Sequence, residues 1–319
     1  MIDVQKLLQG DLRTLARAIT LVESQKSEHR LEAAKLIDQI LPYTGKSLRI
    51  GISGSPGVGK STFIESFGCY LADLGRKIAV VAIDPSSPVS GGSILGDKTR
   101  MEQLSRRENV FIRPSPSQGH LGGVAQSTRE SILLCEAAGF DTILVETVGV
   151  GQSEITVASM VDFFMVLLLP NSGDELQGIK KGIVELAQAI VINKADGASK
   201  TLAELTKGHY QQALQILPDS SQSGAKVLLA SALEKTGLSE IWSTIETYYQ
   251  NAVQNNSFQA KRELQLQKWF KDHFQEGLWE LIKSHEKFQK KYQSELQKVI
   301  SKKSSVSSSV LALLKEFQS

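Results

Sequence analysis

Short runs of β-branched and aliphatic residues alternate along this chain with longer segments in which apolar residues recur every three or four positions. This alternation is typical of parallel strands joined by crossover helices. The pattern predicts an α/β fold with a mostly parallel central sheet covered by helices on both faces. Seven strands are expected, at Leu48–Ile52, Ile78–Ile83, Val110–Arg113, Thr142–Glu146, Phe163–Leu169, Ala189–Asn193 and Val227–Ser231.

Helical patterns without strands stand at both ends of the chain. Residues 11–23 and 31–41 predict two amphipathic helices that pack on the central domain. Beyond residue 250, apolar and aromatic residues from Leu266 to Ile282 mark one side of a long helix, which packs within the monomer or against a second copy. The serine-rich stretch Ser304–Ser309 is expected to interrupt the chain before a last helix. We therefore expect an N-terminal helical extension (1–46), a sheet domain (47–250) and a C-terminal helical arm (251–319).

The first strand runs into the segment GSPGVGKST, residues 54–62, which fits the phosphate-binding loop. Glycines let the backbone curl so that N–H groups point at phosphate oxygens, and the next helix presents its positive end to the same anion. Lys60 would reach the β- and γ-phosphates, Ser61 would offer its hydroxyl to Mg²⁺, and Thr62 would bond the phosphates. Backbone contacts are expected from Gly54, Gly57, Val58 and Gly59. The fold is thus predicted to be that of a P-loop nucleoside triphosphatase.

A second motif, Asn193-Lys194-Ala195-Asp196, closes another apolar strand and so lies at the sheet edge where nucleotides bind. Asp196 can accept two hydrogen bonds from guanine, whereas adenine offers no such donor pair, so GTP is predicted over ATP. Lys194 would lie along the base and ribose, and Asn193 would link this loop to the phosphate loop. A third loop could contact the guanine carbonyl through its backbone N–H groups: Ser231, Ala232 and Leu233.

Carboxylates at strand ends are the candidates for the Mg²⁺ shell. Glu146 follows a buried strand, and its length favours holding a metal-bound water. Asp84 ends another strand and Asp97 lies in the loop after it, although either could instead cap a turn. The metal set is therefore Ser61, Asp84, Asp97 and Glu146.

Hydrolysis requires a positioned water and positive charge at the transferred phosphoryl group. Lys60, Glu146 and Gln152 are the catalytic candidates, but Val150 stands where Ras-like enzymes place their water-positioning glutamine. Intrinsic turnover is therefore expected to be slow, with acceleration when a partner or second subunit supplies an arginine. The candidate switch segments are residues 86–101, 115–123 and 147–154, and the local arginines are Arg100, Arg113 and Arg129.

Charge and composition exclude other classes of protein. With 36 basic and 34 acidic residues the net charge is only +2, so a nucleic-acid partner is not expected. No apolar run is long enough for a membrane span and the first residues do not read as a signal peptide, which predicts a cytoplasmic location. Two isolated cysteines indicate reduced thiols, and five scattered histidines indicate no transition-metal site.

Taken together, these motifs resemble the cobalamin-associated GTPases that act as chaperones of methylmalonyl-CoA mutase, a group also labelled LAO/AO or ArgK transport ATPases. The similarity runs nearly end to end. It rests on the phosphate loop, the Asn193–Asp196 motif, and the segments 15–24, 84–101, 113–116, 121–123 and 146–154.

The resemblance implies a GTPase that binds GTP or GDP with Mg²⁺ and forms a homodimer through the C-terminal arm. It also implies that GTP hydrolysis gates the loading and protection of an adenosylcobalamin-dependent acyl-CoA mutase, with a cobalamin adenosyltransferase as a further partner left open. Two alternatives remain at this point. One is a transport-associated ATPase or kinase, against which Asp196 argues, and the other is a metallochaperone GTPase, against which the absence of clustered soft ligands in the sequence argues.

Overall fold

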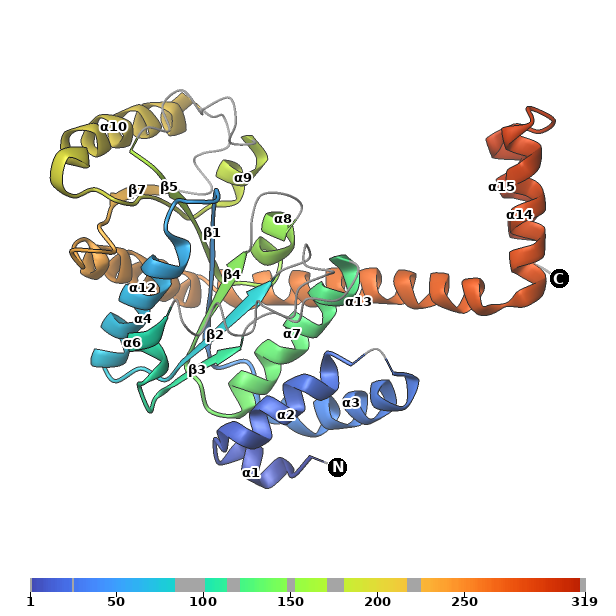
Figure 1. Ribbon diagram of the computed structural model, residues 1–319, viewed down its shortest axis with the longest axis horizontal. Coiled ribbons are helices and arrows are strands. Elements are labelled where there is room, and N and C mark those ends of the chain that lie inside the picture. Colours follow the sequence, from blue (N-terminus) through green and yellow to red (C-terminus); the bar gives the residue numbers. More distant parts are fainter. Residues whose placement is uncertain are drawn as a thin grey trace. The chain divides into compact units, whose positions relative to one another are not determined.

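The structure is a computed structural model that describes residues 2–24, 26–83, 101–113, 121–147, 153–170, 181–216 and 225–315. Within these residues a seven-stranded parallel sheet has the order β3-β2-β4-β1-β5-β6-β7 (Figure 1). All seven predicted strands are confirmed and differ from the prediction only at their ends. They are β1 (Leu48–Gly54), β2 (Ile78–Ile83), β3 (Val110–Arg113), β4 (Thr142–Thr147), β5 (Phe163–Leu168), β6 (Ala189–Ile192) and β7 (Lys226–Leu229).

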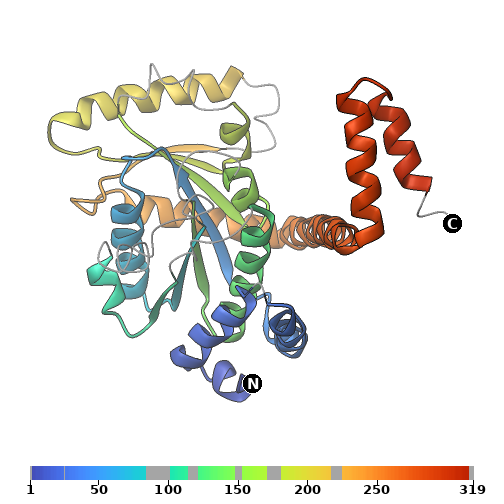
Figure 2. The ribbon, with the colours of Figure 1, turned by 45° about the vertical axis from the view of Figure 1, so that its right-hand side comes forward.

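Helices cover both faces of the sheet, as the alternating pattern predicts (Figure 2). On one face lie α4 (Lys60–Asp73), α6 (Glu102–Ser105) and α12 (Leu238–Gln254). The other face carries α7 (Leu121–Ala137) and α8 (Ser153–Ala158), while α9 (Lys181–Leu186) packs on β5 and α10 (Lys200–Ile216) packs on β6 and β7. The core on the α4 face is built from strand side chains such as Ile50 and Ile52 against Phe63 and Phe67, all fully buried.

Close packing of α8 on β1 depends on a glycine. A Cβ atom at Gly51 would lie 2.8 Å from Cδ2 of Phe164 and 2.9 Å from Cγ1 of Val157 and from Cγ2 of Val161. Because these distances are shorter than real carbon contacts, any larger residue at position 51 would push α8 away from the strand. The central strand thereby fixes the height of α8 above the sheet.

The N-terminal helices are α1 (Val4–Leu8), α2 (Leu12–Val22) and α3 (Ser27–Ile40), followed by a single 3₁₀ turn, η1 (Leu41–Tyr43). Asp11 caps α2, because its carboxylate accepts the backbone N–H of Thr14 at 2.8 Å. Helices α2 and α3 both pack against α7, so the N-terminal extension covers the sheet domain as predicted.

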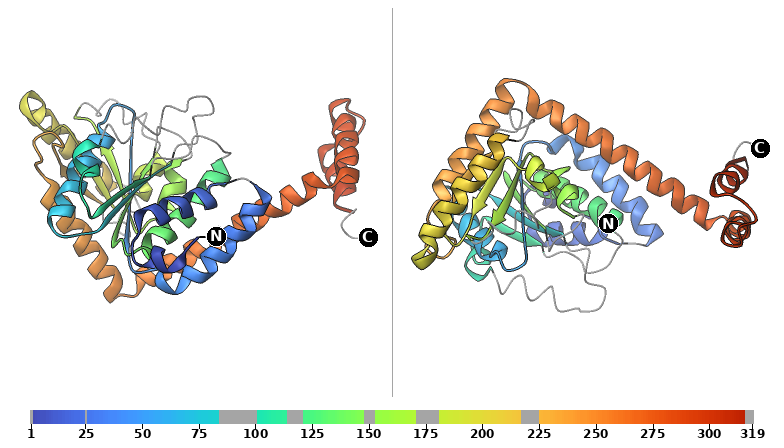
Figure 3. Two further views of the ribbon diagram at one scale, coloured as in Figure 1. Left: turned by 60° about the horizontal axis from the view of Figure 1, so that its bottom comes forward. Right: turned by 90° about the horizontal axis from the view of Figure 1, so that it is seen from above.

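The chain divides into two compact units, residues 1–262 and 263–319. Helix α13 (Ser257–Ser284) begins in the first unit and supplies the first helix of the second; Figure 3 shows it as one continuous helix. In the second unit α14 (Glu286–Ile300) packs against α15 (Val306–Leu314). The serines interrupt the chain less than predicted: Ser305 accepts the N–H of Ser308 at 3.1 Å and so caps α15, which places residues 307–309 inside the helix.

A buried network of charges joins the amino ends of β1 and β5 to the start of α13. The guanidinium of Arg262 donates to both carboxylate oxygens of Asp162, at 2.9 and 2.8 Å, and to the carbonyl of Ser47 at 2.6 Å. Beside it, Arg49 donates to both oxygens of Glu136, at 2.9 and 3.0 Å. Buried charges are tolerated only when paired in this way, so the first turns of α13 are held to the sheet domain.

Both cysteines are buried and free. Burial raises the pKa of the Cys69 thiol and, more strongly, that of the Cys135 thiol. Among the residues that the structure describes, no helix combines the length and the apolar character needed to cross a bilayer.

Candidate nucleotide-binding site

The predicted phosphate loop connects β1 to α4 at the carboxyl edge of the sheet. Gly57 and Gly59 have φ angles of +82° and +90°, in the left-handed region that favours glycine. A Cβ atom at Gly54 would lie 2.6 Å from the carbonyl oxygen of Leu167 on β5. The three glycines of the motif are therefore required by backbone conformation and by close approach to the neighbouring strand. Within the same loop, the Val58 side chain is fully buried, whereas Thr62 on the first turn of α4 is exposed.

Lys60 folds back over the loop from the first position of α4. Its ammonium donates to the carbonyl oxygens of Gly54 at 2.7 Å and Ser55 at 3.3 Å. An ammonium has three N–H donors, so the charge stays on the loop while it bonds both carbonyls. Burial lowers the pKa of Lys60, and the negative charges of Glu146 and Glu154 oppose that shift. The lysine is thus partly buried on the loop, and two carboxylates favour its charged form.

Asn193 links the guanine motif to the phosphate loop. Its side-chain amide donates to the carbonyl of Val58 at 2.9 Å, and its amide oxygen accepts the N–H of Ala232 at 3.3 Å. The side chain is buried, so neither polar end can be satisfied by water instead. A single residue therefore bridges the phosphate loop and the Ser231–Leu233 loop, which puts three separate chain segments in one place.

Lys194 adds a second link between the Asn193–Asp196 motif and the phosphate loop. Its ammonium donates to the carbonyl of Gly57 at 2.8 Å, and its backbone is left-handed at φ +58°. A Cβ atom at Gly59 would lie 3.0 Å from Nδ2 of Asn193 and 3.7 Å from Cε of Lys194. Gly59 is thus needed both for its φ angle and for the space in which the two side chains cross.

Asp196, the predicted guanine acceptor, is oriented by a hydroxyl. Ser231 Oγ donates to Oδ2 of Asp196 and accepts the backbone N–H of Glu234 at 3.0 Å. The short turn that carries Ser231 is closed by paired backbone hydrogen bonds between Ser231 and Thr236, at 3.2 and 3.1 Å. Ser231 is buried, whereas Asp196 is partly exposed. The serine hydroxyl therefore fixes one carboxylate oxygen, and the carboxylate stays accessible to a ligand.

The third loop is also held by helix α4. Ser66 on α4 donates its hydroxyl to the carbonyl of Ala232 at 2.6 Å, a contact that the sequence does not reveal. Leu233, the last predicted member of this loop, is 78% exposed. A large aliphatic side chain left this open, two residues after the serine that bonds Asp196, is suited to cover one face of a bound base.

Oxygen donors fit for Mg²⁺ lie at the same edge. Glu146 pairs in register with Ile52 of β1, two residues before Gly54, and Ser61 follows Lys60. A hydroxyl and a carboxylate, together with phosphate oxygens and water, are the ligands that Mg²⁺ prefers. Among the described residues no group of three or more His, Cys, Asp or Glu side chains could hold a metal ion. The predicted residues Asp84, Asp97 and Gln152 lie outside the described residues.

Two of the three candidate arginines are engaged within the chain. Arg113, at the end of β3, pairs with the buried carboxylate of Glu23 on α2 and donates to Thr20 Oγ1 at 3.2 Å. Arg129 on α7 donates to Ser159 Oγ at 2.8 Å. Arg100 lies outside the described residues. Among the described residues, the ammonium groups of Lys60 and Lys194 both contact the phosphate loop.

One buried acid at the site was given no role by the motifs. Glu154 is 2% exposed and acts electrostatically on Lys60, although it lies 94 positions further along the chain. Glu146 is 5% exposed. In the sequence, Glu154 shows only as an acid in the first turn of a helix after a glycine-rich segment. An exposed acid near a helix N-terminus gives the same pattern, so the burial of Glu154 could not be predicted.

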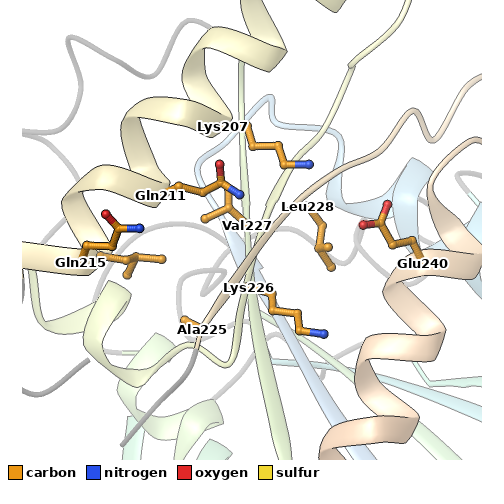
Figure 4. A pocket seen from close by; sticks show the side chains of 9 residues that line it. Lys207, Gln211, Gln215, Ala225, Lys226, Val227, Leu228 and Glu240 are labelled. Carbon is orange, nitrogen blue, oxygen red and sulfur yellow. The ribbon is translucent and has the colours of Figure 1, made fainter. Parts of the chain in front are cut away.

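A separate cavity of about 640 Å³ opens at the free edge of β7, between α10 and α12 (Figure 4). Its lining is mixed: Lys207 and Gln211 come from α10, Lys226 from the strand and Glu240 from α12. No residue predicted for the nucleotide lines it.

Comparison with known proteins places these features in a protein family. Residues 15–287 match the family described as "Methylmalonyl Co-A mutase-associated GTPase MeaB". The chain is 49% identical over 288 residues to "GTPase ArgK" of Escherichia coli (strain K12), covering 90% of this chain and 87% of that protein. It is 44% identical over 324 residues to the mouse "Methylmalonic aciduria type A homolog, mitochondrial", covering 98% of this chain and 78% of that protein.

A solved structure supports the same fold. The crystal structure described as "LAO/AO transport system kinase" superposes with a TM-score of 0.80 at 40% sequence identity. The match covers 99% of this chain and 96% of that one.

Proposed function

The chain belongs to the MeaB family of methylmalonyl-CoA mutase-associated GTPases, and from this premise we propose that it gates adenosylcobalamin loading and protection of methylmalonyl-CoA mutase or a related acyl-CoA mutase. It is a GTPase, as its relatives are named. The link to the mutase is supported by the family match, and the nucleotide-dependent part of the proposal is carried by the Asn193 bridge, which ties the phosphate loop to both predicted guanine loops. Guanine recognition and phosphate binding would therefore be coupled through one buried side chain.

The site residues divide into three roles. Backbone N–H groups of the phosphate loop and the Lys60 ammonium would bind the phosphates, Asp196 would accept the guanine donors, and Lys194 would lie beside the base. Ser61 and Glu146 would hold Mg²⁺, directly or through water, with Asp84 and Asp97 as further candidates. The bound ion supplies charge neutralisation at the phosphate oxygens. Lys60 would meet the negative charge that develops on the terminal phosphoryl group, and Gln152 is the candidate to orient water.

A partner should accelerate this reaction. Because Arg113 and Arg129 are both engaged within the chain, an arginine supplied by the mutase or by a second subunit is the expected source of extra positive charge. The test is to mix the purified chain with candidate adenosylcobalamin-dependent acyl-CoA mutases and measure phosphate release from GTP. Turnover should rise at least about tenfold, since a supplied arginine contributes about 10³–10⁵ in rate. Unchanged turnover and no complex on size-exclusion chromatography with any such mutase would overturn the proposal.

The homodimer is part of the same proposal. Along α13 the aromatic side chains of Phe270 and Phe274 are 76% and 61% exposed and stack on each other at 6.3 Å. Aromatic residues on a helix face are the type of side chain that subunit interfaces bury. The double variant F270E/F274E should be a monomer by sedimentation while GTP binding is retained. A K268E/K271E variant on the same helix, at exposed lysines, is the control and should stay a dimer.

A transport-associated kinase is the second candidate, because the superposed crystal structure carries that description. Such a protein would use ATP. A competition assay with both nucleotides decides: we expect ATP to displace bound GTP only at concentrations about a hundredfold higher, since adenine leaves the Asp196 carboxylate unpaired. Equal displacement would favour the kinase. A cytoplasmic location and docking of a cobalamin adenosyltransferase remain parts of the proposal to be tested by fractionation and pull-down.

A further inference from the structure

Helix α4 contacts both ends of the proposed nucleotide site. Its first residue, Lys60, donates to the carbonyls of the phosphate loop. Further along the same helix, Ser66 Oγ donates to the carbonyl oxygen of Ala232 at 2.6 Å. Ser66 is 7% exposed and Ala232 is 5% exposed, so water has little access to replace this hydrogen bond. The Ser231–Leu233 loop is therefore tied to the helix that begins at the phosphates.

The Ser231–Leu233 loop keeps one backbone donor for a ligand. Of the N–H groups in residues 231–234, only that of Leu233 has no acceptor among the described residues. Leu233 is also 78% exposed, so a ligand can approach this donor. The loop therefore offers one N–H to the carbonyl of a bound guanine. The other three donate within the chain, Ser231 to Thr236 O at 3.2 Å, Ala232 to Asn193 Oδ1 at 3.3 Å and Glu234 to Ser231 Oγ at 3.0 Å.

Ser66 fixes the direction of that donor through a shared peptide unit. The carbonyl of Ala232 and the N–H of Leu233 belong to one planar peptide group, which is trans. In a trans peptide the C=O and the N–H point in opposite directions. Because Ser66 holds the carbonyl against α4, the N–H of Leu233 points away from that helix. Turning the N–H in another direction would break a buried hydrogen bond.

We propose that Ser66 is a positioning residue for guanine recognition: its hydroxyl orients the Ala232–Leu233 peptide so that the Leu233 N–H donates to the guanine carbonyl. The inference rests on the nucleotide site proposed above. Adenine carries an amino group in place of that carbonyl and would set a donor against the Leu233 N–H. Ser66 thereby adds a second point of discrimination, next to the two guanine donors that Asp196 would accept.

Two analogues of GDP test these two parts of the base separately. In 6-thio-GDP a sulfur atom, which is a weaker acceptor, replaces the carbonyl oxygen, and both donors to Asp196 remain. IDP keeps the carbonyl and lacks the 2-amino donor. Calorimetry on full-length chains in excess Mg²⁺ measures the dissociation constants of GDP and of both analogues.

The wild type should bind GDP about fivefold more tightly than 6-thio-GDP, which is about 1 kcal/mol, because one neutral hydrogen bond is weakened. Ser66→Ala should lower this preference to less than about twofold and should leave the preference for GDP over IDP unchanged. Ser66→Cys, with nearly the same volume and only a weak S–H donor, should act in the same way and serves if the alanine variant does not fold. Ser131→Ala on α7 is the matched control and should change neither preference, because Ser131 is 2% exposed and donates to the Ser127 carbonyl of its own helix at 2.7 Å.

The outcomes separate this inference from the proposed function. If the wild-type chain binds no guanine nucleotide, the proposed site is wrong. If the wild type prefers GDP to ADP but binds GDP and 6-thio-GDP equally, the site stands and the Leu233 contact is overturned. An unchanged preference over 6-thio-GDP in a folded Ser66→Ala or Ser66→Cys variant overturns the positioning role. Equal loss of the preferences over 6-thio-GDP and IDP, or the same loss in Ser131→Ala, would also overturn it, because the change would then reflect general loosening.

Discussion

Guanine specificity should depend on a serine that would touch the base only through its backbone. Ser231 Oγ donates to Oδ2 of Asp196 and holds the carboxylate that reads guanine. The change Ser231→Ala removes this donor without altering the backbone of the loop, which stays closed by its hydrogen bonds with Thr236. The N–H of Glu234, which Ser231 Oγ accepts in the wild type, lies in an exposed turn where water can replace it.

The size of the effect follows from the contacts. A hydrogen bond to a charged group contributes about 1.5–3 kcal/mol, and the lower figure applies because Asp196 is only partly buried. A loss of about 1.5 kcal/mol corresponds to roughly tenfold weaker GTP binding. ATP makes no paired contact with Asp196, so its affinity should not change. Asp196→Ala, which removes both base contacts, should lose on the order of a hundredfold.

Competition binding with GTP and ATP on four chains tests this reasoning: the wild type, each single variant, and the double variant. Ser231→Ala should lower the ratio of GTP affinity to ATP affinity about tenfold. In the Asp196→Ala background the same change should cause no further loss of GTP affinity, because the two residues act as one unit. Ser239→Ala, an exposed serine on α12, is the control. Additive losses in the double variant, or equal losses of GTP and ATP affinity in Ser231→Ala, would refute an orienting role.

Three further predictions concern the loop, the charge network and the N-terminal helices. Gly59→Ala should weaken nucleotide binding strongly in a filter assay, because a φ of +90° is strained for any L side chain and a Cβ atom 3.0 Å from Asn193 Nδ2 would displace the amide that bridges the loops. Arg262→Ala removes the guanidinium that pairs with the buried Asp162 carboxylate. The free energy of unfolding, measured with urea, should fall by about 3–5 kcal/mol. Burial raises the pKa of Glu23 above its usual value of 4.5. The stability that this group contributes is therefore full below pH 4.5 and is lost as the pH rises through the raised pKa. The Tm of the wild type minus the Tm of Glu23→Gln should fall as the pH rises over this range. A pH-independent difference would contradict this assignment.

The strands and the nucleotide loops could be predicted because their signals are local. Each apolar run of four to seven residues stands beside turn residues, and GSPGVGKST or Asn193–Asp196 follows at once. The bonds of Asn193 could be anticipated in kind, since the carboxyl ends of parallel strands meet at one edge.

The remaining features are set by long-range contacts. Arg262 bonds Asp162 one hundred positions earlier in the chain, and nothing in the sequence near either residue distinguishes them from solvated surface charges. Likewise, Ser66 contacts a loop 166 positions away. Glu154 could be seen in the shared motif, but its burial depends on Gly51 letting α8 settle on the sheet. Such pairings arise from packing, which local patterns do not record.

The inaccessibility of both native thiols has a practical consequence for spectroscopy. Cys135 is completely buried and Cys69 is 6% exposed, and burial raises the pKa of each, so little reactive thiolate forms near neutral pH. A cysteine introduced at an exposed position, such as Leu233 beside the proposed base site, would therefore take up a maleimide fluorophore selectively in the otherwise unaltered chain. Nucleotide exchange could then be followed in real time by emission from one dye.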